Sequence, residues 1–239
     1  LEACAREHDL EVRLGTAVSP DDLRAGGFDA VVICAGAKPC GLPVPGADLP
    51  HVVQAVDLLR DPTLAEGKSH IVIVGGGSVG CETAYFLAYE LGKDVAIVEM
   101  LPYFMKGVCT ANRGHLIHHL ERKGVRLLNC ATVKRIGERE VVITRNVSPT
   151  VPDPYVTWRP ILPENVPNPL ARPIREELRE ETLEADLVVL AVGMKPDDSL
   201  YEACARERVS PEVHNLGDSF SVGRVFEAVK AGYRVGLAL

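Results

Sequence analysis

The sequence lacks several features that would direct it to particular functions. It contains seven cysteines but no CxxC motif, and no apolar run is long enough to cross a membrane. A net charge of −7 and an isoelectric point near 5.5 leave no basic surface for a phosphate backbone. These absences argue against nucleic-acid binding, a membrane span, a dithiol centre and a cysteine-based zinc site. We expect a soluble protein of the reducing cytoplasm.

The composition is nevertheless that of a folded protein. Aromatic residues make up only 5% of the chain, but the hydrophobic fraction of 46% is ample for a core. A length of 239 residues allows one large domain or two modest ones.

Residues 71–99 have the order strand, glycine turn, helix, strand and acid that a dinucleotide cofactor requires. A bare GxGxxG motif also occurs in turns that bind no phosphate. Here it lies between two β-rich runs, and Glu99 ends the second run 19 residues after Gly80, which makes the motif more specific. The expected cofactor-binding residues are Gly75, Gly76, Gly77, Ser78, Val79, Gly80 and Glu99.

Each residue type suits its place in this motif. Gly75 allows a sharp turn out of the strand, Gly77 allows the backbone to approach a pyrophosphate, and Gly80 allows the helix to pack on the sheet. The helix N-terminus would then face the diphosphate. The Glu99 carboxylate can accept hydrogen bonds from a ribose 2′-OH and would repel a 2′-phosphate, so we expect NADH in preference to NADPH.

The rest of the chain alternates β-rich and helical segments, which predicts an α/β fold. The pair 132–136 and 140–144 suits a small antiparallel crossover, and the apolar run 184–193 would return the chain to a parallel sheet. A Pro/Gly-rich connection covers 40–50. Further strands are expected at 11–14, 29–34, 125–128 and 213–216, and helices at 112–123 and 222–239.

Five motifs carry a family resemblance, at 34–39, 75–82, 98–102, 191–196 and 216–218. With them the chain resembles the two-dinucleotide-binding-domain flavoproteins, in which an NAD(H)-binding domain is inserted in an FAD-binding domain. It is most similar to the C-terminal part of the enoate reductase and 2,4-dienoyl-CoA reductase (NADH:flavin oxidoreductase) group. Ala35 replaces the threonine that is usual in the first motif.

The resemblance implies a Rossmann-like NAD(P)-binding domain at 68–195, with a Pro-rich insertion at 145–180. This domain would be inserted in a truncated FAD-binding Rossmann-like domain formed by 1–67 and 196–239. Members of the family bind the FAD diphosphate with an earlier GxGxxG, which residues 1–67 lack. We therefore expect a C-terminal fragment that begins midway through the FAD-binding domain and binds FAD weakly or not at all alone.

The same resemblance implies a function. A flavin oxidoreductase of this kind passes a hydride from NADH to FAD and electrons onward to a second redox centre. That centre would lie on a missing N-terminal barrel with FMN and an iron–sulfur cluster, where enoate- or dienoyl-type substrates are reduced. The barrel and the missing FAD half-domain would be partners in cis or as a subunit, and a homo-oligomer is also possible. The alternative is a catalytically silent nucleotide-binding or assembly module that keeps the fold.

The resemblance also assigns roles to single residues. Glu82 lies seven residues after Gly75, where relatives place a glutamate beside the nicotinamide and flavin rings. The helix dipole alone would also explain an acid in the first turn of a helix.

The resemblance implies roles for two further pairs of residues. Asp218, after Gly217, matches an aspartate that binds FAD, although a turn would also favour this residue type. Gly36 and Gly193 match glycines near the junction of the two domains, where simple strand-end turns are the alternative.

Two other features have open interpretations. His115, His118 and His119 have a helical spacing that can ligate zinc, yet they lack a partner acid or cysteine nearby, which favours a solvated helix face. Residues 148–173 contain eight prolines and the only tryptophan, Trp158. They form either a strap that docks on the missing domain or an ordered surface loop.

Overall fold

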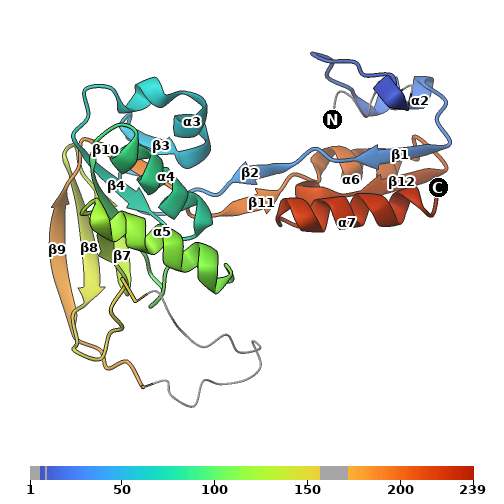
Figure 1. Ribbon diagram of the computed structural model, residues 1–239. Coiled ribbons are helices and arrows are strands. Elements are labelled where there is room, and N and C mark those ends of the chain that lie inside the picture. The colour runs from blue at the N-terminus through green and yellow to red at the C-terminus, as the bar shows by residue number, and fades with distance from the viewer. Residues whose placement is uncertain (1–5, 9, 157–171) are drawn as a thin grey trace. The chain divides into compact units, whose positions relative to one another are not determined.

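The computed structural model describes residues 6–8, 10–156 and 172–239 and contains two compact units. The larger unit is Pro39–Gly193, and the smaller unit combines Leu1–Lys38 with Met194–Leu239 (Figure 1). A ribbon of β2 (Ala37–Pro39) and β11 (Met194–Pro196) carries both connections between them. The larger unit is therefore inserted between two segments of the smaller one.

The larger unit is built on a five-stranded parallel sheet. Its central strand β4 is buried from Ile71 to Val74, as expected of a sheet that is covered on both faces. This confirms the predicted α/β class. The strands, in spatial order, are β3 (Val52–Gln54), β10 (Leu187–Leu190), β4 (His70–Val74), β5 (Asp94–Val98) and β6 (Arg126–Leu128).

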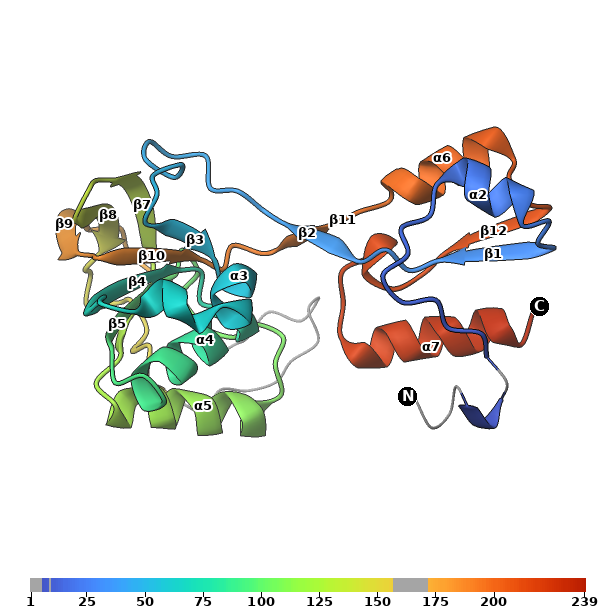
Figure 2. The same ribbon diagram turned by 90° about the horizontal axis from the view of Figure 1, so that it is seen from above.

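Different layers cover the two faces of this sheet (Figure 2). Ile71 and Ile73 of β4 pack in the cluster that includes the helices, whereas Val72 and Val74 pack in the cluster that includes the antiparallel sheet, as alternation along a strand requires. The helices are α3 (Ala55–Arg60), the 3₁₀ turn η1 (Pro62–Ala65), α4 (Ser78–Tyr89) and α5 (Thr110–Arg122). The antiparallel strands are β7 (Ala131–Ile136), β8 (Glu140–Asn146) and β9 (Leu178–Glu184).

The smaller unit is built on a two-stranded parallel sheet of β1 (Ala30–Ile33) and β12 (Glu212–Asn215). Val31 and Ile33 pack in a small core with residues of α2 (Pro20–Ala25) and α6 (Ser199–Glu207). The 3₁₀ turn η2 (Gly217–Ser219) and α7 (Val225–Gly236) follow. No helix in the described parts of the chain is both long enough and apolar enough to span a membrane.

The structure differs from the sequence predictions at two strands. Residues 11–14 are not in a strand, and Leu10, Val12 and Leu14 are exposed, so that prediction is wrong. The charged strand β9 was not predicted, because it is held by pairing with β8 and not by apolar alternation. The compact units divide after residue 38, since β3 pairs with β10 of the larger unit, and the predicted domain bounds at 67 and 68 stay a prediction.

The half-buried carboxylate of Asp186 gives the larger unit a pH-dependent contact. Asp186 Oδ2 accepts hydrogen bonds from the backbone N–H groups of Ser69 (3.0 Å) and His70 (3.1 Å), which joins the starts of β10 and β4. These bonds, that of His70 first, lower the pKa of the Asp186 carboxyl below its ordinary value of 3.8. The ionised form therefore stabilises the fold above about pH 4, and this contribution is lost as the pH falls through the folded-state pKa.

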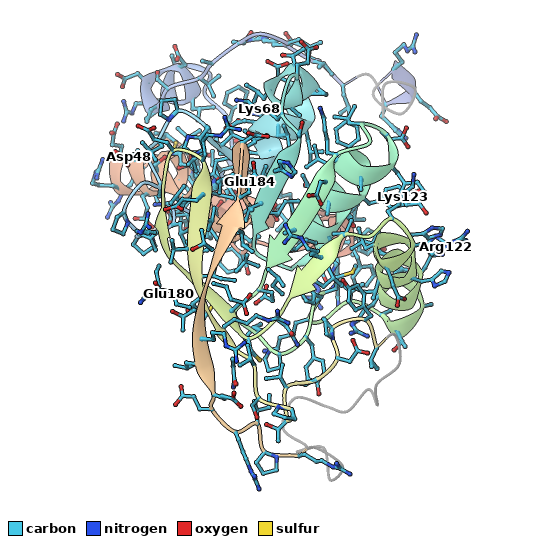
Figure 3. The ribbon with its side chains drawn as sticks, turned by 90° about the vertical axis from the view of Figure 1, so that its left-hand side faces the viewer. Asp48, Lys68, Arg122, Lys123, Glu180 and Glu184 are labelled. Carbon is cyan, nitrogen blue, oxygen red and sulfur yellow. The ribbon has the colours of Figure 1, made fainter. Side chains whose placement is uncertain are left out.

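We expect Asp186→Asn to reduce the loss of unfolding free energy between about pH 5 and pH 2, because the asparagine amide does not titrate. Urea unfolding at several pH values measures this. Asp48→Asn is the matched control, since Asp48 is an exposed side chain of the same unit (Figure 3). Equal pH slopes for the Asp186 variant and the parent would contradict the assignment.

Candidate functional site: a dinucleotide cleft

A cavity of about 440 Å³ lies at the carboxyl ends of the parallel strands in the larger unit. Gly75 and Gly77 follow β4, Glu99 follows β5, and all three line the cavity. Ligands of open α/β sheets bind at this edge. The volume is within the range of ordinary small-molecule sites.

The glycines at 75 and 80 are required by close packing. Gly75 has φ of +108°, and a Cβ there would collide with the Ala191 carbonyl oxygen at the end of β10. A Cβ at Gly80 would collide with the Gly75 carbonyl oxygen. The first glycine thus makes the turn, and the third brings α4 against it, as the motif predicts.

Gly77, in contrast to Gly75 and Gly80, has open surroundings. It is exposed, and a Cβ there would meet nothing within 4 Å. Gly77 is also the N-cap of α4, and in the described part of the chain no side chain caps this helix. The first N–H groups of a helix have no partner within the helix, so this end of α4 is free to receive an anion.

Glu99 lies at the rim of the same cavity and is 8% exposed. Its Oε2 accepts a hydrogen bond from Gly76 N at 2.6 Å, and its Oε1 accepts one from Leu101 N at 2.7 Å. An ionised carboxylate has about four acceptor positions, so two remain for a ligand hydroxyl. The described residues that line the cavity include no lysine or arginine that would bind a 2′-phosphate.

The structure thus brings together the predicted turn, helix start and acid, and this constellation fits a dinucleotide diphosphate and ribose. Their role as ligands stays a prediction. Sequence reasoning missed the opposite wall, which is formed by 42–44 of the Pro/Gly-rich connection and by 131–133 at the start of β7. No local pattern indicates that a connection folds back over a distant strand end.

Glu82 lies on α4, and its side chain is exposed. The first turn of this helix contains no acid, so the dipole of the first turn does not explain the residue. Its predicted position beside reacting rings stays a prediction.

Asp218 and Gly217 belong to the smaller unit. Gly217 has φ of +63°, and Asp218 Oδ1 accepts a hydrogen bond from Gly223 N at 3.0 Å. Asp218 therefore serves the turn, and its FAD role stays a prediction.

Gly36 and Gly193 lie at the ends of the ribbon of β2 and β11 and have φ of +86° and +99°. Each carbonyl accepts a hydrogen bond that closes the ribbon, from Asp197 N and Cys40 N respectively. The positive φ values suit glycine at a strand-end turn, and the predicted role of both residues at the domain junction stays a prediction.

The described cysteines are free thiols. Burial raises the pKa of the Cys81 thiol, which lies just after the glycine turn on α4, to about 12. Cys81 is therefore not available as a thiolate nucleophile near neutral pH.

The histidines of α5 take part in an aromatic cluster. His119 Nδ1 lies 2.8 Å from the Tyr89 hydroxyl, and Tyr89 stacks on Tyr85 with ring centroids 4.4 Å apart. His115 and His118 are exposed. Trp158 lies outside the described residues.

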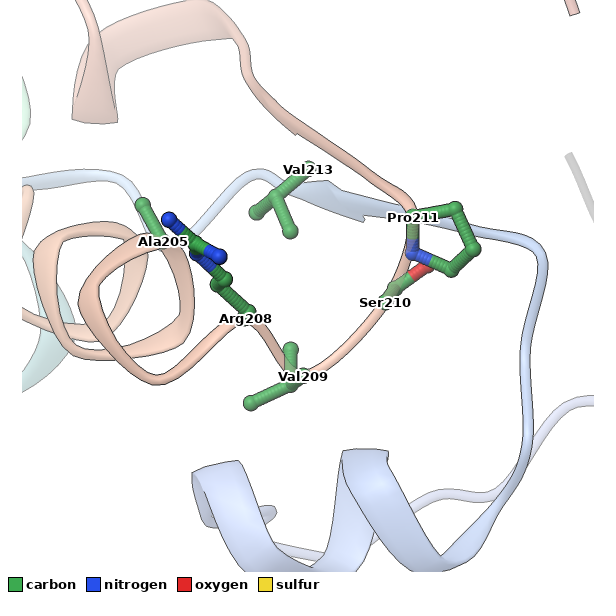
Figure 4. A pocket seen from close by; sticks show the side chains of 6 residues that line it. All are labelled: Ala205, Arg208, Val209, Ser210, Pro211 and Val213. Atoms are coloured by element: carbon green, nitrogen blue, oxygen red, sulfur yellow. The ribbon is translucent and has the colours of Figure 1, made fainter.

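A second hollow, of about 590 Å³, is open to solvent on the smaller unit (Figure 4). It lies between the end of α6 and the start of β12, where Arg208 and Pro211 line it. It contains none of the predicted site residues.

Comparisons with known proteins identify the family of the chain. Residues 5–213 match the family model described as pyridine nucleotide-disulphide oxidoreductase. The chain is 28% identical over 237 residues to an NADH oxidase of Thermoanaerobacter brockii, covering 98% of this chain and 32% of the relative. It is 30% identical over 229 residues to a bilirubin reductase of Mediterraneibacter gnavus, covering 95% and 30%.

A cinnamate reductase of Clostridium sporogenes is 25% identical over 237 residues, covering 98% of this chain and 30% of the relative. The fold is also that of a 2-naphthoyl-CoA reductase structure, with a TM-score of 0.81 at 24% identity, covering 100% of this chain and 31% of that one. The chain therefore spans about a third of the length of these relatives. Since the family model matches most of the chain, the protein belongs to the pyridine nucleotide-disulphide oxidoreductase family, whose members are pyridine-nucleotide-dependent flavin oxidoreductases.

Proposed function

We propose that this chain is the NADH-binding module of a flavin oxidoreductase. In this proposal the larger unit binds NADH through the glycine turn and Glu99. The smaller unit contributes Gly217 and Asp218 to an FAD site that needs further polypeptide, so FAD binds this chain weakly or not at all. Gly36 and Gly193 would provide the turns at the junction where the chain passes between the two domains.

The observation that carries the proposal is the uncapped N-terminus of α4 beside the open Gly77. A helix start with free N–H groups and a positive dipole end attracts the diphosphate. Glu99, at the end of the neighbouring strand, would accept hydrogen bonds from the adenosine ribose. Because its carboxylate would repel a 2′-phosphate and no basic side chain among the described lining residues offsets it, NADH is preferred over NADPH.

When bound, the nicotinamide and the flavin supply the redox chemistry, a hydride transfer from C4 of one to N5 of the other. This chain contributes position: α4 and Glu99 orient the dinucleotide, and the apolar wall at 42–44 excludes water from the cleft. Glu82 would lie beside the reacting rings and orient them.

The larger protein would contain the second redox centre. We infer from the family resemblance that this centre lies on an N-terminal barrel with FMN and an iron–sulfur cluster. Relatives of which this chain spans about a third, one of them a cinnamate reductase, contain further polypeptide that is long enough for such a part. The substrate would accordingly be an enoate or a dienoyl thioester, reduced at a site on that part.

Helix α7 supports further polypeptide as the partner. No residue of α7, all of which lies in the described part of the chain, is buried. Four of its apolar side chains and that of the C-cap residue Leu237 are 64% to 81% exposed. A monomeric protein rarely leaves such a face uncovered. We infer that the missing FAD half-domain covers it, in cis or as a subunit. The five side chains are Val225, Phe226, Val229, Tyr233 and Leu237.

Titration of the whole chain with NADH, NADPH and FAD tests the function. We expect NADH to bind in the micromolar range or somewhat more weakly, NADPH about tenfold more weakly, and FAD weakly or not at all. Calorimetry measures the three affinities. A folded chain that does not bind NADH would reject the oxidoreductase proposal and favour the alternative of a catalytically silent module that keeps the fold. The observation that favours this alternative is the lack of a second GxGxxG motif in residues 1–67.

A further inference from the structure

The middle of the glycine turn is held by a segment that follows β5, residues 101–105, here called the cover segment. Gly76 is buried, and its carbonyl accepts a hydrogen bond from Met105 N at 2.8 Å. A Cβ at Gly76 would collide with the ring of Phe104, which is itself fully buried. The position of the turn therefore depends on the position of the cover segment.

The cover segment does not hold this conformation by itself. Met105 has φ of +53°, in the left-handed region that residues other than glycine rarely adopt. Such a conformation persists only where surrounding contacts determine it. Two buried side chains provide such contacts.

Arg113, on α5, is the first of them, and it is 3% exposed. Its Nε donates to the Phe104 carbonyl oxygen at 3.1 Å, and its Nη2 donates to the Val156 carbonyl oxygen at 2.9 Å. One guanidinium thus joins the cover segment to the Pro-rich insertion. Hydrogen bonds from a buried charged group are among the stronger ones in a protein.

Asn129, which follows β6, makes the same kind of connection. It is fully buried, and its Nδ2 donates to the carbonyl oxygens of Pro102 and Pro152, both at 2.8 Å. The two bridges tie both ends of the cover segment to residues 150–156, here called the insertion arm.

The insertion arm is itself anchored on the edge of the sheet. The Tyr155 hydroxyl donates to the Val125 carbonyl oxygen at 2.8 Å and accepts from Leu127 N at 3.1 Å, beside the edge strand β6. This part of the insertion packs on its own unit, which favours the surface-loop interpretation over a strap for residues 150–156.

We propose that Arg113 and Asn129 are positioning residues that couple the insertion arm to the dinucleotide turn. The insertion arm holds the cover segment, the cover segment holds Gly76, and Gly76 sets where the start of α4 meets the diphosphate. The affinity for the dinucleotide is then tuned by a loop that does not touch it. This inference rests on the proposed function for its ligand but not for its structural readout.

The test compares Arg113→Met, Arg113→Lys and Arg122→Met in the whole chain. Arg122 is exposed on the same helix and serves as the matched control (Figure 3). We expect the Kd for NADH to rise about tenfold in Arg113→Met and less in Arg113→Lys, whose single ammonium can reach only one of the two carbonyls. The control should bind as the parent does, and circular dichroism establishes that each variant is folded.

Amide hydrogen exchange without ligand gives the second readout. Exchange at Met105 N–H and Gly76 N–H should be faster in Arg113→Met and unchanged in Arg122→Met. Asn129→Leu should also raise the Kd for NADH and speed exchange at both amides. It replaces Arg113→Met in the test if Arg113→Met does not fold. The double variant should show less than the sum of the two effects, since both bridges act on one segment.

Parent-like NADH affinity together with unchanged exchange at Met105 in a folded Arg113→Met variant would overturn the proposal. If the parent chain itself does not bind NADH, the proposed function fails, and the exchange rates alone still decide whether Arg113 holds the cover segment. Faster exchange with unchanged affinity would reject the coupling to the ligand.

Discussion

Replacing Gly80 with alanine is expected to lower the unfolding free energy by about 3 kcal/mol, a typical upper value for overpacking. The added methyl group would collide with the Gly75 carbonyl oxygen, and it would also lie 3.3 Å from the Ala191 Cβ. These neighbours are a backbone carbonyl just after β4 and a short side chain just after β10, so α4 itself must shift away from β4. Urea unfolding measures the loss, and NADH affinity should fall with it.

Gly77→Ala is the matched comparison on the same turn. Its φ is −71°, which alanine adopts freely, and the new methyl group would meet nothing within 4 Å. We expect a loss of at most about 1 kcal/mol, the ordinary difference between glycine and alanine at an N-cap. NADH affinity should nevertheless fall about tenfold or more, because the methyl group occupies the approach to the diphosphate.

These two variants separate folding from binding at positions three residues apart. Equal stability of Gly80→Ala and the parent would show that α4 does not pack on Gly75 as described. Parent-like NADH binding by Gly77→Ala would show that the diphosphate does not approach this turn, and the proposed site would be lost.

Glu99→Ala should have the second large effect. It removes the acceptor of the Gly76 N–H and of the Leu101 N–H, and Gly76 is buried. Hydrogen bonds to a charged group contribute about 1.5–3 kcal/mol each, so we expect a loss of about 3 kcal/mol in unfolding free energy. NADH affinity should fall at least tenfold, since the turn loses its support and the ribose loses its acceptor.

Glu99→Gln separates charge from shape. Its amide oxygen can still accept one of the two N–H groups, whereas its NH₂ faces the other as a second donor, so stability should fall by roughly half as much. The repulsion of a 2′-phosphate disappears with the charge. The ratio of NADPH to NADH affinity should therefore rise towards one, as competitive titration measures. An unchanged ratio would show that another feature selects the cofactor.

The sequence was most informative where the cofactor motif is contiguous. From 71 to 99 the strand, turn, helix and strand follow one another, and each has its own local pattern, so the order of residues was enough to predict them. Gly75 and Gly80 have the packing roles that the motif predicts, and Glu99 lies at the cleft.

Prediction was poorer where structure depends on pairing. The pattern of residues 11–14 indicated a strand, but a strand forms only beside a partner, and Val12 and Leu14 are exposed. Strand β9 has few apolar residues and forms because β8 lies beside it, with ion pairs such as Lys134 to Glu180 across the sheet. Neither outcome follows from a local period.

The sequence by itself determined the α/β class, the glycine turn and the acid that ends the next strand, because these depend on backbone sterics and on periods within a few residues. Only the tertiary structure decided that 42–44 line the cleft, that Glu99 also supports Gly76, and that Arg113 joins the insertion arm to the cover segment. Those contacts connect residues far apart in the chain. Their energy comes from burial and from hydrogen bonds that exist only after the layers have packed.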